Sequence, residues 1–146
     1  MDSQTIIKKN TVSYKQIMEH IKKCNFNPPL ETQVNLKEYV KKILKFGDCF
    51  EYWRNNKLIG LIVVYLNDYK TKRGFITYLG VVKNHLRKGI ATKLLKETII
   101  TAKKMGFTEI SLEVEKNNYP ALRFYQKNGF KKMALKSSKI FMTKFL

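Results

Sequence analysis

The segment 79–95, LGVVKNHLRKGIATKLL, joins the end of one apolar run to the start of an amphipathic one through a basic turn at Gly89. The run that it completes, GFITYLGVV (74–82), is rich in β-branched and aromatic residues and predicts a strand. The run after the turn has apolar residues at helical spacing, namely Ile90, Leu94, Leu95, Ile99, Ala102 and Met105. A further strand, EISLEV (109–114), follows Gly106. A strand, a helix and a strand in succession indicate one parallel pair of strands.

The basic turn at Gly89 predicts a site for an anion. The first backbone N–H groups of a helix have no partner within the helix, and the positive end of the helix dipole lies beside them. Arg87 and Lys88 add two cations at the same place. An ordinary turn without a ligand is the alternative, because a single glycine often marks a turn before a helix. This stretch alone leaves both interpretations open.

Two helices and one short strand are predicted near the N-terminus. TIIKK (5–9) is a possible first strand. SYKQIMEHIKKC (13–24) and NLKEYVKKILKFG (35–47) carry apolar residues at helical spacing and predict amphipathic helices. Gly47 suits the left-handed residue that commonly follows the end of a helix.

Strands and a last helix are predicted in the rest of the chain. CFEYW (49–53) and LIGLIVVYL (58–66) flank a polar turn and predict a hairpin. PALRFYQKN (120–128) predicts a helix, and FKKMALK (130–136) and KIFMTKF (139–145) predict two final alternating strands.

The order of these elements predicts one α/β domain of the α+β type over residues 1–146. We expect a mixed, mostly antiparallel sheet of six to seven strands flanked by about four helices. A chain of 146 residues with 44% apolar residues is long enough for one sizeable core.

The formal net charge of +18 raises the question of a nucleic-acid partner. The basic residues are spread along the whole chain, and most of them are Lys instead of the Arg that reads bases. We therefore expect no nucleic-acid partner, and a solvated basic surface explains the charge. Such a surface still attracts an anionic cofactor or substrate.

The sequence predicts a cytoplasmic protein without a metal site. No segment approaches the roughly 18 consecutive apolar residues of a membrane span, and the first ten residues lack the apolar stretch of a signal peptide. The two cysteines, Cys24 and Cys49, show no ligand spacing, and the two histidines are His20 and His85. We expect both cysteines to be reduced structural thiols.

Two separated motifs point to a known family. The first is Leu86, Arg87, Lys88, Gly89, Ile90 and Ala91, and the second combines LEV (112–114), Asn118, Ala121–Leu122, Phe124–Tyr125 and Gly129–Phe130. Together they resemble the acetyl-CoA-binding core of the GCN5-related N-acetyltransferases (GNAT). The family's loop reads Arg or Gln, two residues, Gly, one residue, then Gly or Ala, so Leu86 departs from it. The resemblance implies the GNAT fold and N-acetyltransferase activity.

The resemblance implies acetyl-CoA as the acetyl donor. Backbone N–H groups of Arg87, Gly89 and Ala91 are expected to bind its pyrophosphate, and Lys88, Ile90 and Thr92 are the other coenzyme-binding residues expected in the loop. Backbone groups of Val81 and Val82 are expected to bind the pantetheine arm where two family strands splay apart. Asn118 is expected beside that arm, and a helix N-cap is its alternative role.

The resemblance also implies two catalytic residues and no metal. Tyr125 resembles the tyrosine that gives a proton to the departing thiolate, and a core aromatic is the alternative. Glu113 lies where the related ribosomal-protein N-terminal acetyltransferases carry their proposed base, and an exposed strand residue is the alternative. Thr77 and Tyr78 lie where many members carry an acid, so that route is closed. No catalytic Ser-His-Asp or Cys-His set is evident, and we expect direct attack by the amine.

The acceptor is the least determined part of the reaction. We expect a small amine or amino sugar, because a basic surface favours anionic substrates. A protein N-terminus or lysine is the second expectation, and a non-catalytic CoA-binding or nucleic-acid-binding module is the third. Residues 13–47 and 67–74 are expected to decide the acceptor, with CNFNPPLETQVNL (24–36) either lining its site or simply connecting two helices. We expect a monomer or a homodimer.

Overall fold

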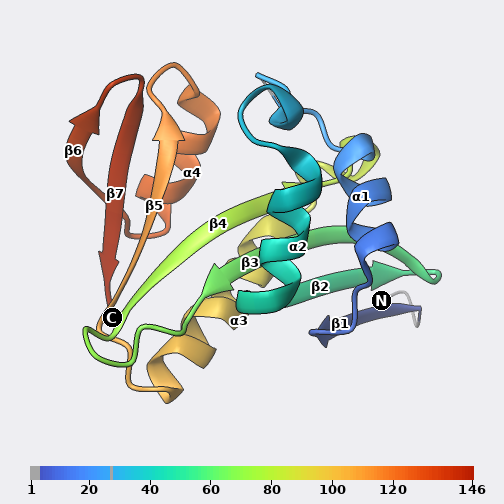
Figure 1. Ribbon diagram of the computed structural model, residues 1–146, viewed down its shortest axis with the longest axis horizontal. Helices are drawn as coiled ribbons and strands as arrows, with labels where there is room; N and C mark the ends of the chain where they lie inside the picture. The colour runs from blue at the N-terminus through green and yellow to red at the C-terminus, as the bar shows by residue number, and fades with distance from the viewer. Residues whose placement is uncertain (1–3, 27) are drawn as a thin grey trace.

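A seven-stranded sheet runs through the computed structural model, which describes residues 4–26 and 28–146 (Figure 1). The elements in chain order are β1 (Thr5–Lys9), α1 (Tyr14–Lys23), the 3₁₀ turn η1 (Leu30–Thr32), α2 (Leu36–Phe46), β2 (Asp48–Arg54), β3 (Lys57–Tyr65), β4 (Arg73–Val81), the 3₁₀ turn η2 (Lys83–His85), α3 (Ile90–Lys104), β5 (Glu109–Glu115), α4 (Tyr119–Lys127), β6 (Lys131–Lys136) and β7 (Lys139–Phe145). The strand order is β1-β2-β3-β4-β5-β7-β6. All neighbours are antiparallel except β4 and β5, which confirms the predicted mixed sheet.

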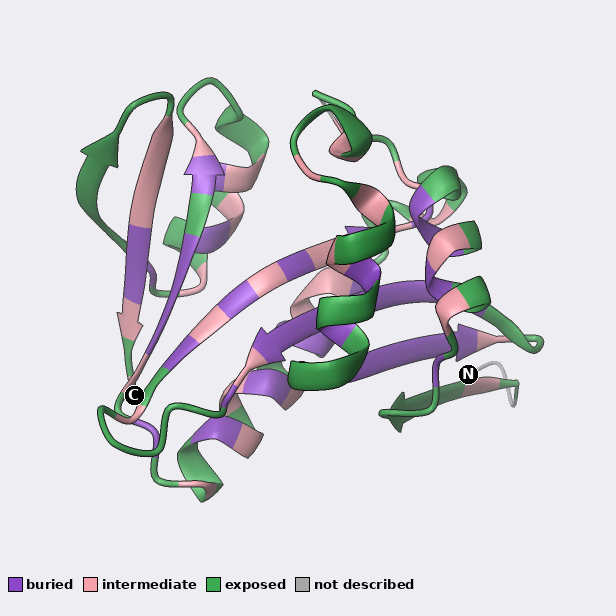
Figure 2. Cartoon of the chain, viewed as in Figure 1, coloured by how far each residue is buried: buried purple, intermediate pink, exposed green. Residues whose placement is uncertain are grey.

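Helices cover both faces of this sheet. Helices α1 and α2 lie on one face, where they bury Ile17, Ile21, Val40 and Ile43 against β2, β3 and β4 (Figure 1). Helices α3 and α4 contribute to the second apolar cluster on the other face, with Leu94, Leu95, Leu122 and Tyr125 among its members. Strands β2 and β3 are buried along most of their length, as Figure 2 shows. None of the helices in the described ranges is long and apolar enough to cross a membrane.

Gly47 ends α2, as expected, but it is not left-handed. Its φ is −90° and its ψ is 153°, which is extended backbone. A Cβ at this position would lie 2.5 Å from Cγ1 of Val63 and 2.9 Å from the carbonyl oxygen of Ile43. Glycine is therefore needed here for the close approach of α2 to β3, and the prediction of a left-handed residue was wrong.

A buried carboxylate, that of Glu51 on β2, joins the sheet to the start of α1. Glu51 is fully buried and accepts hydrogen bonds from the N–H of Thr11 (2.7 Å), the hydroxyl of Thr11, the N–H of Val12 (3.2 Å) and Nε1–H of Trp53 (2.9 Å). A buried charge needs such partners, because its desolvation is costly. These contacts fix the chain immediately before the N-cap of α1, Ser13.

The two parallel strands separate after a short contact. Strand β4 pairs with β5 only from Arg73 to Phe75, opposite Glu109 to Ser111. Nε of Arg73 lies 3.0 Å from the Glu109 carboxylate at this closed end. Beyond it the strands diverge, and Figure 1 shows the V-shaped opening between them. This opening positions the site described next.

Candidate active site

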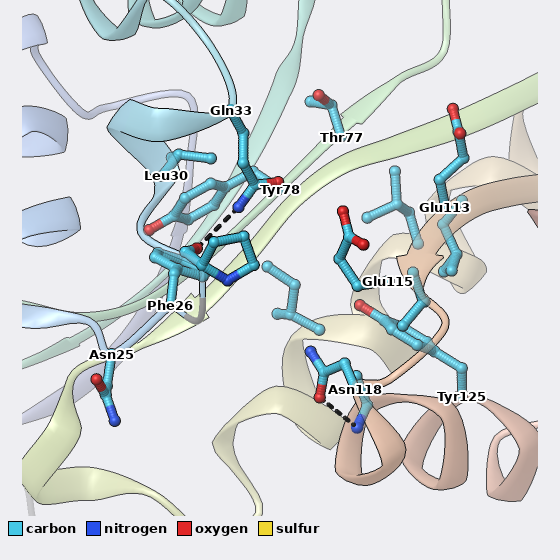
Figure 3. A pocket seen from close by; sticks show the side chains of 16 residues that line it. Asn25, Phe26, Leu30, Gln33, Thr77, Tyr78, Glu113, Glu115, Asn118 and Tyr125 are labelled. Atoms are coloured by element: carbon cyan, nitrogen blue, oxygen red, sulfur yellow. Dashed lines mark hydrogen bonds between the residues drawn. The ribbon is translucent and has the colours of Figure 1, made fainter. Parts of the chain in front are cut away.

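A cavity of about 240 Å³ lies in the opening between β4 and β5 (Figure 3). Strand β4 lines it with residues 76–79, and β5 lines it with residues 112–115. Helix α4 contributes Asn118, Ala121 and Tyr125. The connection between α1 and α2 closes one wall with Asn25, Phe26, Pro28, Leu30 and Gln33. The second family motif and part of the 24–36 segment therefore meet at one place.

The end of β4 directs backbone groups into this opening. The N–H of Val82 donates to the carbonyl of Ile59 on the β3 side (2.8 Å), so the adjacent Val81, paired with Gly60, is at a non-hydrogen-bonded position of the ladder. The alternation turns the N–H and C=O of Val81 toward β5. The expectation of free backbone groups does not hold for Val82, whose carbonyl also accepts from the N–H of His85 (2.9 Å).

The turn before α3 places unpaired N–H groups at the same end of the sheet. Arg87 and Gly89 are both left-handed, with φ of 63° and 77°. The first hydrogen bond of α3 runs from the N–H of Lys93 to the carbonyl of Gly89 (3.1 Å). The N–H groups of residues 90–92 precede that bond and point out of the helix end. They provide a cradle for an anion, as the sequence predicted for a helix start of this kind.

The side chains around this turn leave room for a ligand. A Cβ built on Gly89 would have no atom within 4 Å, so the surface beside it is open. Arg87 and Lys88 are exposed next to it. Leu86 occupies the family's Arg or Gln position, and it is 50% exposed and offers no polar group. Among the described residues of the loop, the groups available to an anion are therefore backbone N–H groups and two flexible cations.

Tyr125 is both a core aromatic and a pocket residue. Its ring is edge-on to Phe124 (5.2 Å between centroids) and to Phe130 (5.5 Å), and the residue is 9% exposed. Figure 3 shows its hydroxyl directed into the cavity. Burial raises the pKa of Tyr125 above its ordinary value, because the phenolate is disfavoured there. The hydroxyl is therefore protonated at neutral pH and available as a proton donor.

Two carboxylates from β5 border the cavity. Glu113 is exposed, and Figure 3 shows its side chain directed away from Tyr125. Glu115 is half-buried, and its carboxylate points into the cavity. Glu113 was predicted from the sequence, and Glu115 was not. Glu115 could have been found from its spacing, because strand residues two apart share a face.

Asn118 is a helix N-cap, the alternative role expected for it from the sequence. Its side-chain oxygen accepts from the N–H of Ala121 (3.3 Å), so it is the N-cap of α4. It also lines the cavity, so the cap does not remove it from the site.

A hydrogen-bonded chain of His20, Cys24 and Tyr78 supports the β4 wall. His20 Nδ1 lies 3.3 Å from the carbonyl of Leu58, which only accepts, so Nε2 is left to accept from the Cys24 thiol (3.4 Å). The Tyr78 hydroxyl donates to Cys24 Sγ (3.7 Å). No Cys-His set was predicted, although the spacing of four residues between His20 and Cys24 could have indicated one.

The charge states of His20 and Cys24 argue against a covalent role for the Cys24 thiol. Burial raises the pKa of the Cys24 thiol to about 11, a shift that the Tyr78 hydrogen bond opposes. Burial lowers the pKa of His20 to about 4. Both groups are neutral at pH 7, and a thiol is a poor nucleophile compared with a thiolate. The geometry therefore remains consistent with direct attack on the donor.

The two segments expected to decide the acceptor have different positions. The 24–36 segment lines the cavity, and Gln33 Nε2–H holds its fold by donating to the carbonyl of Pro28 (2.8 Å). Asn27 lies outside the described residues. The 67–74 segment lies at the closed end of the V, where the N–H of Thr108 donates to the carbonyl of Lys72 (2.9 Å). That segment is away from the cavity, contrary to the expectation.

Comparisons with known proteins agree with this geometry. The model of the acetyltransferase (GNAT) family matches residues 14–130. Over 78 residues the chain is 37% identical to N-alpha-acetyltransferase 30 of Schizosaccharomyces pombe, which covers 52% of each chain. Over 63 residues it is 40% identical to an N-alpha-acetyltransferase of Saccharolobus solfataricus, covering 42% of this chain and 38% of that one. The matched part thus spans about half or less of these relatives' lengths.

Solved structures share the fold at low sequence identity. The PaiA N-acetyltransferase of Thermoplasma acidophilum, in complex with coenzyme A, superposes with a TM-score of 0.81 at 21% identity, covering 97% of this chain and 99% of that one. The ribosomal-protein-S18-alanine N-acetyltransferase of Escherichia coli gives a TM-score of 0.79 at 17% identity, with coverages of 97% and 93%. At these identities the likeness concerns the fold alone.

Proposed function

Since the chain belongs to the acetyltransferase (GNAT) family and uses acetyl-CoA as its acetyl donor, we propose that its acceptor is the α-amino group at the N-terminus of a peptide or protein. The observation that carries the proposal is the cavity in the V between β4 and β5, into which Tyr125 and Glu115 point and which Glu113 borders. In a chain with a net charge of +18, these carboxylates make the cavity a local site for a cationic amine.

The residues around the V suit acetyl-CoA. The N–H groups of residues 90–92 and the side chains of Arg87 and Lys88 would hold the pyrophosphate at the start of α3. The N–H and C=O of Val81, which face β5, would bond the pantetheine arm as an added strand would. Acetyl-CoA supplies an activated thioester when bound. Coenzyme held by these groups would run from the α3 turn toward the cavity.

The carboxylates of β5 would prepare the attacking amine. An α-amino group has an ordinary pKa of about 7.7 to 8.0, so most of it is protonated at pH 7. We assign Glu113 as the base that takes this proton, directly or through a water molecule. Glu115, whose carboxylate points into the cavity, would hold the ammonium in place before that transfer. The free amine then attacks the carbonyl carbon.

Tyr125 would complete the transfer on the leaving-group side. Its hydroxyl is protonated and directed into the cavity, so it gives its proton to the departing sulfur. The nitrogen loses its second proton to solvent as the amide forms, the Tyr125 phenolate takes a proton back from solvent, and Glu113 releases the proton that it took.

The names of several relatives support one acceptor class. Curated relatives over the matched half include N-alpha-acetyltransferases, which favours a peptide N-terminus over the small amine or amino sugar that we expected first. The wall formed by the 24–36 segment supports the same choice, because it lies across the cavity from β5, where the first residues of a peptide would contact it.

A peptide with a free N-terminus and no lysine is expected to be acetylated. Release of free thiol from acetyl-CoA would be followed with this peptide, with an N-terminally blocked peptide containing one lysine, and with glucosamine. We expect thiol release and a mass increase of one acetyl group for the first peptide only. Transfer restricted to the blocked peptide would identify a lysine acceptor, and transfer restricted to glucosamine would identify an amino sugar. Either result would contradict the proposed acceptor.

Replacing Glu113 with Gln is expected to lower turnover at pH 7 by roughly ten- to a hundredfold, at or below the lower end of the usual range for general acid–base catalysis, because part of the amine is already unprotonated. The loss should shrink as the pH rises to the pKa of the amine, since the free amine then replaces the base. Replacing Glu115 with Gln should mainly raise KM for the acceptor. The pH profiles of kcat and kcat/KM check both statements.

The two variants serve as controls for each other, because each removes one carboxylate from the same strand without changing size. If Glu115→Gln instead shows the rate loss that recovers at high pH, Glu115 is the base and our assignment of Glu113 is wrong.

A further inference from the structure

A second cavity, of about 410 Å³, lies at the end of the sheet where β3 begins and β4 ends. Three segments that are distant in sequence line it: the last turn of α1, the start of β3 and the turn η2. In Figure 1 the end of β4 reaches α1 at this end of the sheet. We call it the lysine pocket, and define it by Lys22, Lys23, Lys57, Lys83, Asn84 and His85.

The lysine pocket is separate from the opening assigned to acetyl-CoA. It includes Ile59 and Val82, which are joined by the hydrogen bond from the N–H of Val82 to the carbonyl of Ile59. The pocket therefore lies on the β3 side of the end of β4. The backbone groups of Val81 face the other side, toward β5.

The charges around the lysine pocket are of one sign. Its described lining contains four ammonium groups and no carboxylate. Burial lowers the pKa of His85, and the nearby charges of Lys88 and Arg54 lower it further. Like charges that converge on a concave site repel one another, and a bound anion relieves that repulsion. Three separate elements supply these lysines, so no single amphipathic helix accounts for their convergence.

A buried polar atom in the same place lacks a partner. Among the described residues, Nδ1 of His85 is buried without a hydrogen bond. Buried polar atoms are normally paired, and an unpaired one calls for an explanation such as a ligand. Asn84 adds a side-chain amide that both donates and accepts. The pocket thus offers directional groups as well as charge.

We propose that the lysine pocket binds a small, multiply phosphorylated anion. Lysine binds phosphate as a point charge without strict geometry, and four lysines call for several negative charges on one ligand. A cavity lined from three sides encloses a small molecule. This site goes beyond acetyl transfer and does not depend on which acceptor the enzyme uses.

The probe is inorganic tripolyphosphate, titrated by calorimetry at constant ionic strength into protein saturated with acetyl-CoA. Saturation occupies the α3 turn, so heat of binding then reports another site. We expect saturable binding with one site per chain, and no saturable binding of sulfate under the same conditions. The double variant Lys23→Ala/Lys57→Ala is expected to raise Kd at least tenfold. Lys83→Ala, on a third element, should raise it in the same direction.

The matched control is Lys37→Ala/Lys41→Ala on the exposed side of α2, which removes the same charge from another surface. Its Kd should change less than twofold. Equal weakening by both double variants would show an effect of net charge and overturn the proposal. Loss of tripolyphosphate binding on saturation with acetyl-CoA would place the anion at the coenzyme site and also overturn it, as would an absence of saturable binding.

Discussion

Replacing Gly89 with Glu is expected to abolish the binding of acetyl-CoA while the protein stays folded. The substitution places a carboxylate against the N–H groups of residues 90–92, where the pyrophosphate would lie. The open space beside Gly89 lets the side chain be accommodated without displacing neighbours. Acetyl-CoA at a hundredfold excess over Kd stabilises the native protein by about 2.7 kcal/mol, roughly 5 to 10 °C in Tm. The variant should lose this shift completely.

Gly106→Glu is the matched control for this experiment. Gly106 is left-handed like Gly89, with φ of 82°, and a Cβ there would also have no atom within 4 Å. It lies beyond the opposite end of the same helix, so it carries the same backbone strain, about 1 to 2 kcal/mol, and the same charge. We expect a normal acetyl-CoA shift for this control. A normal shift for Gly89→Glu as well would show that the loop does not bind the coenzyme.

Replacing Tyr125 with Phe is expected to lower turnover about a hundredfold, with little change in affinity for acetyl-CoA. The ring contacts with Phe124 and Phe130 remain, and only the proton donor is lost. Contributions of a general acid range from about a hundredfold to ten-thousandfold. The lower value applies here because a thiolate is a good leaving group. Turnover with a peptide acceptor and acetyl-CoA binding by thermal shift are the two measurements.

Tyr119→Phe controls for removal of a hydroxyl from α4. Tyr119 begins the same helix and is 60% exposed, so its variant should retain full turnover. Equal turnover of Tyr125→Phe and the wild type would remove Tyr125 from the mechanism. A loss of acetyl-CoA binding without a separate effect on rate would make Tyr125 a binding residue instead.

The order of the elements could be predicted from the sequence because each has a local cause. Period-two and helical spacing mark the strands and helices, and the parallel pair follows from the strand, helix and strand around Gly89. The second motif placed Tyr125 and Asn118 on one helix beside β5, where the structure has them. These features depend on residues close together in the chain.

The features that the sequence did not reveal depend on distant residues. Glu51 is an ordinary strand residue until Thr11 and Val12 fold over it. The conformation of Gly47 is set by the approach of Val63 on a neighbouring strand. The separation of β4 from β5 depends on the whole sheet, and so does the hydrogen bond from the N–H of Val82 to the carbonyl of Ile59 on β3. No local pattern reports contacts of this kind.

The clamp around Glu51 also bears on how this enzyme could change over evolutionary time. The carboxylate fixes where α1 begins, and α1 in turn places His20 and Cys24 behind Tyr78, which lines the cavity. The 24–36 segment follows α1, so its first end is held in place by the contacts of Glu51 with Thr11 and Val12, which do not involve the segment itself. Mutations in that segment can therefore change the wall of the cavity while the contacts of Glu51 stay intact. Under the proposed function, divergence in acceptor choice is thus separated from the support of α1 by one buried side chain.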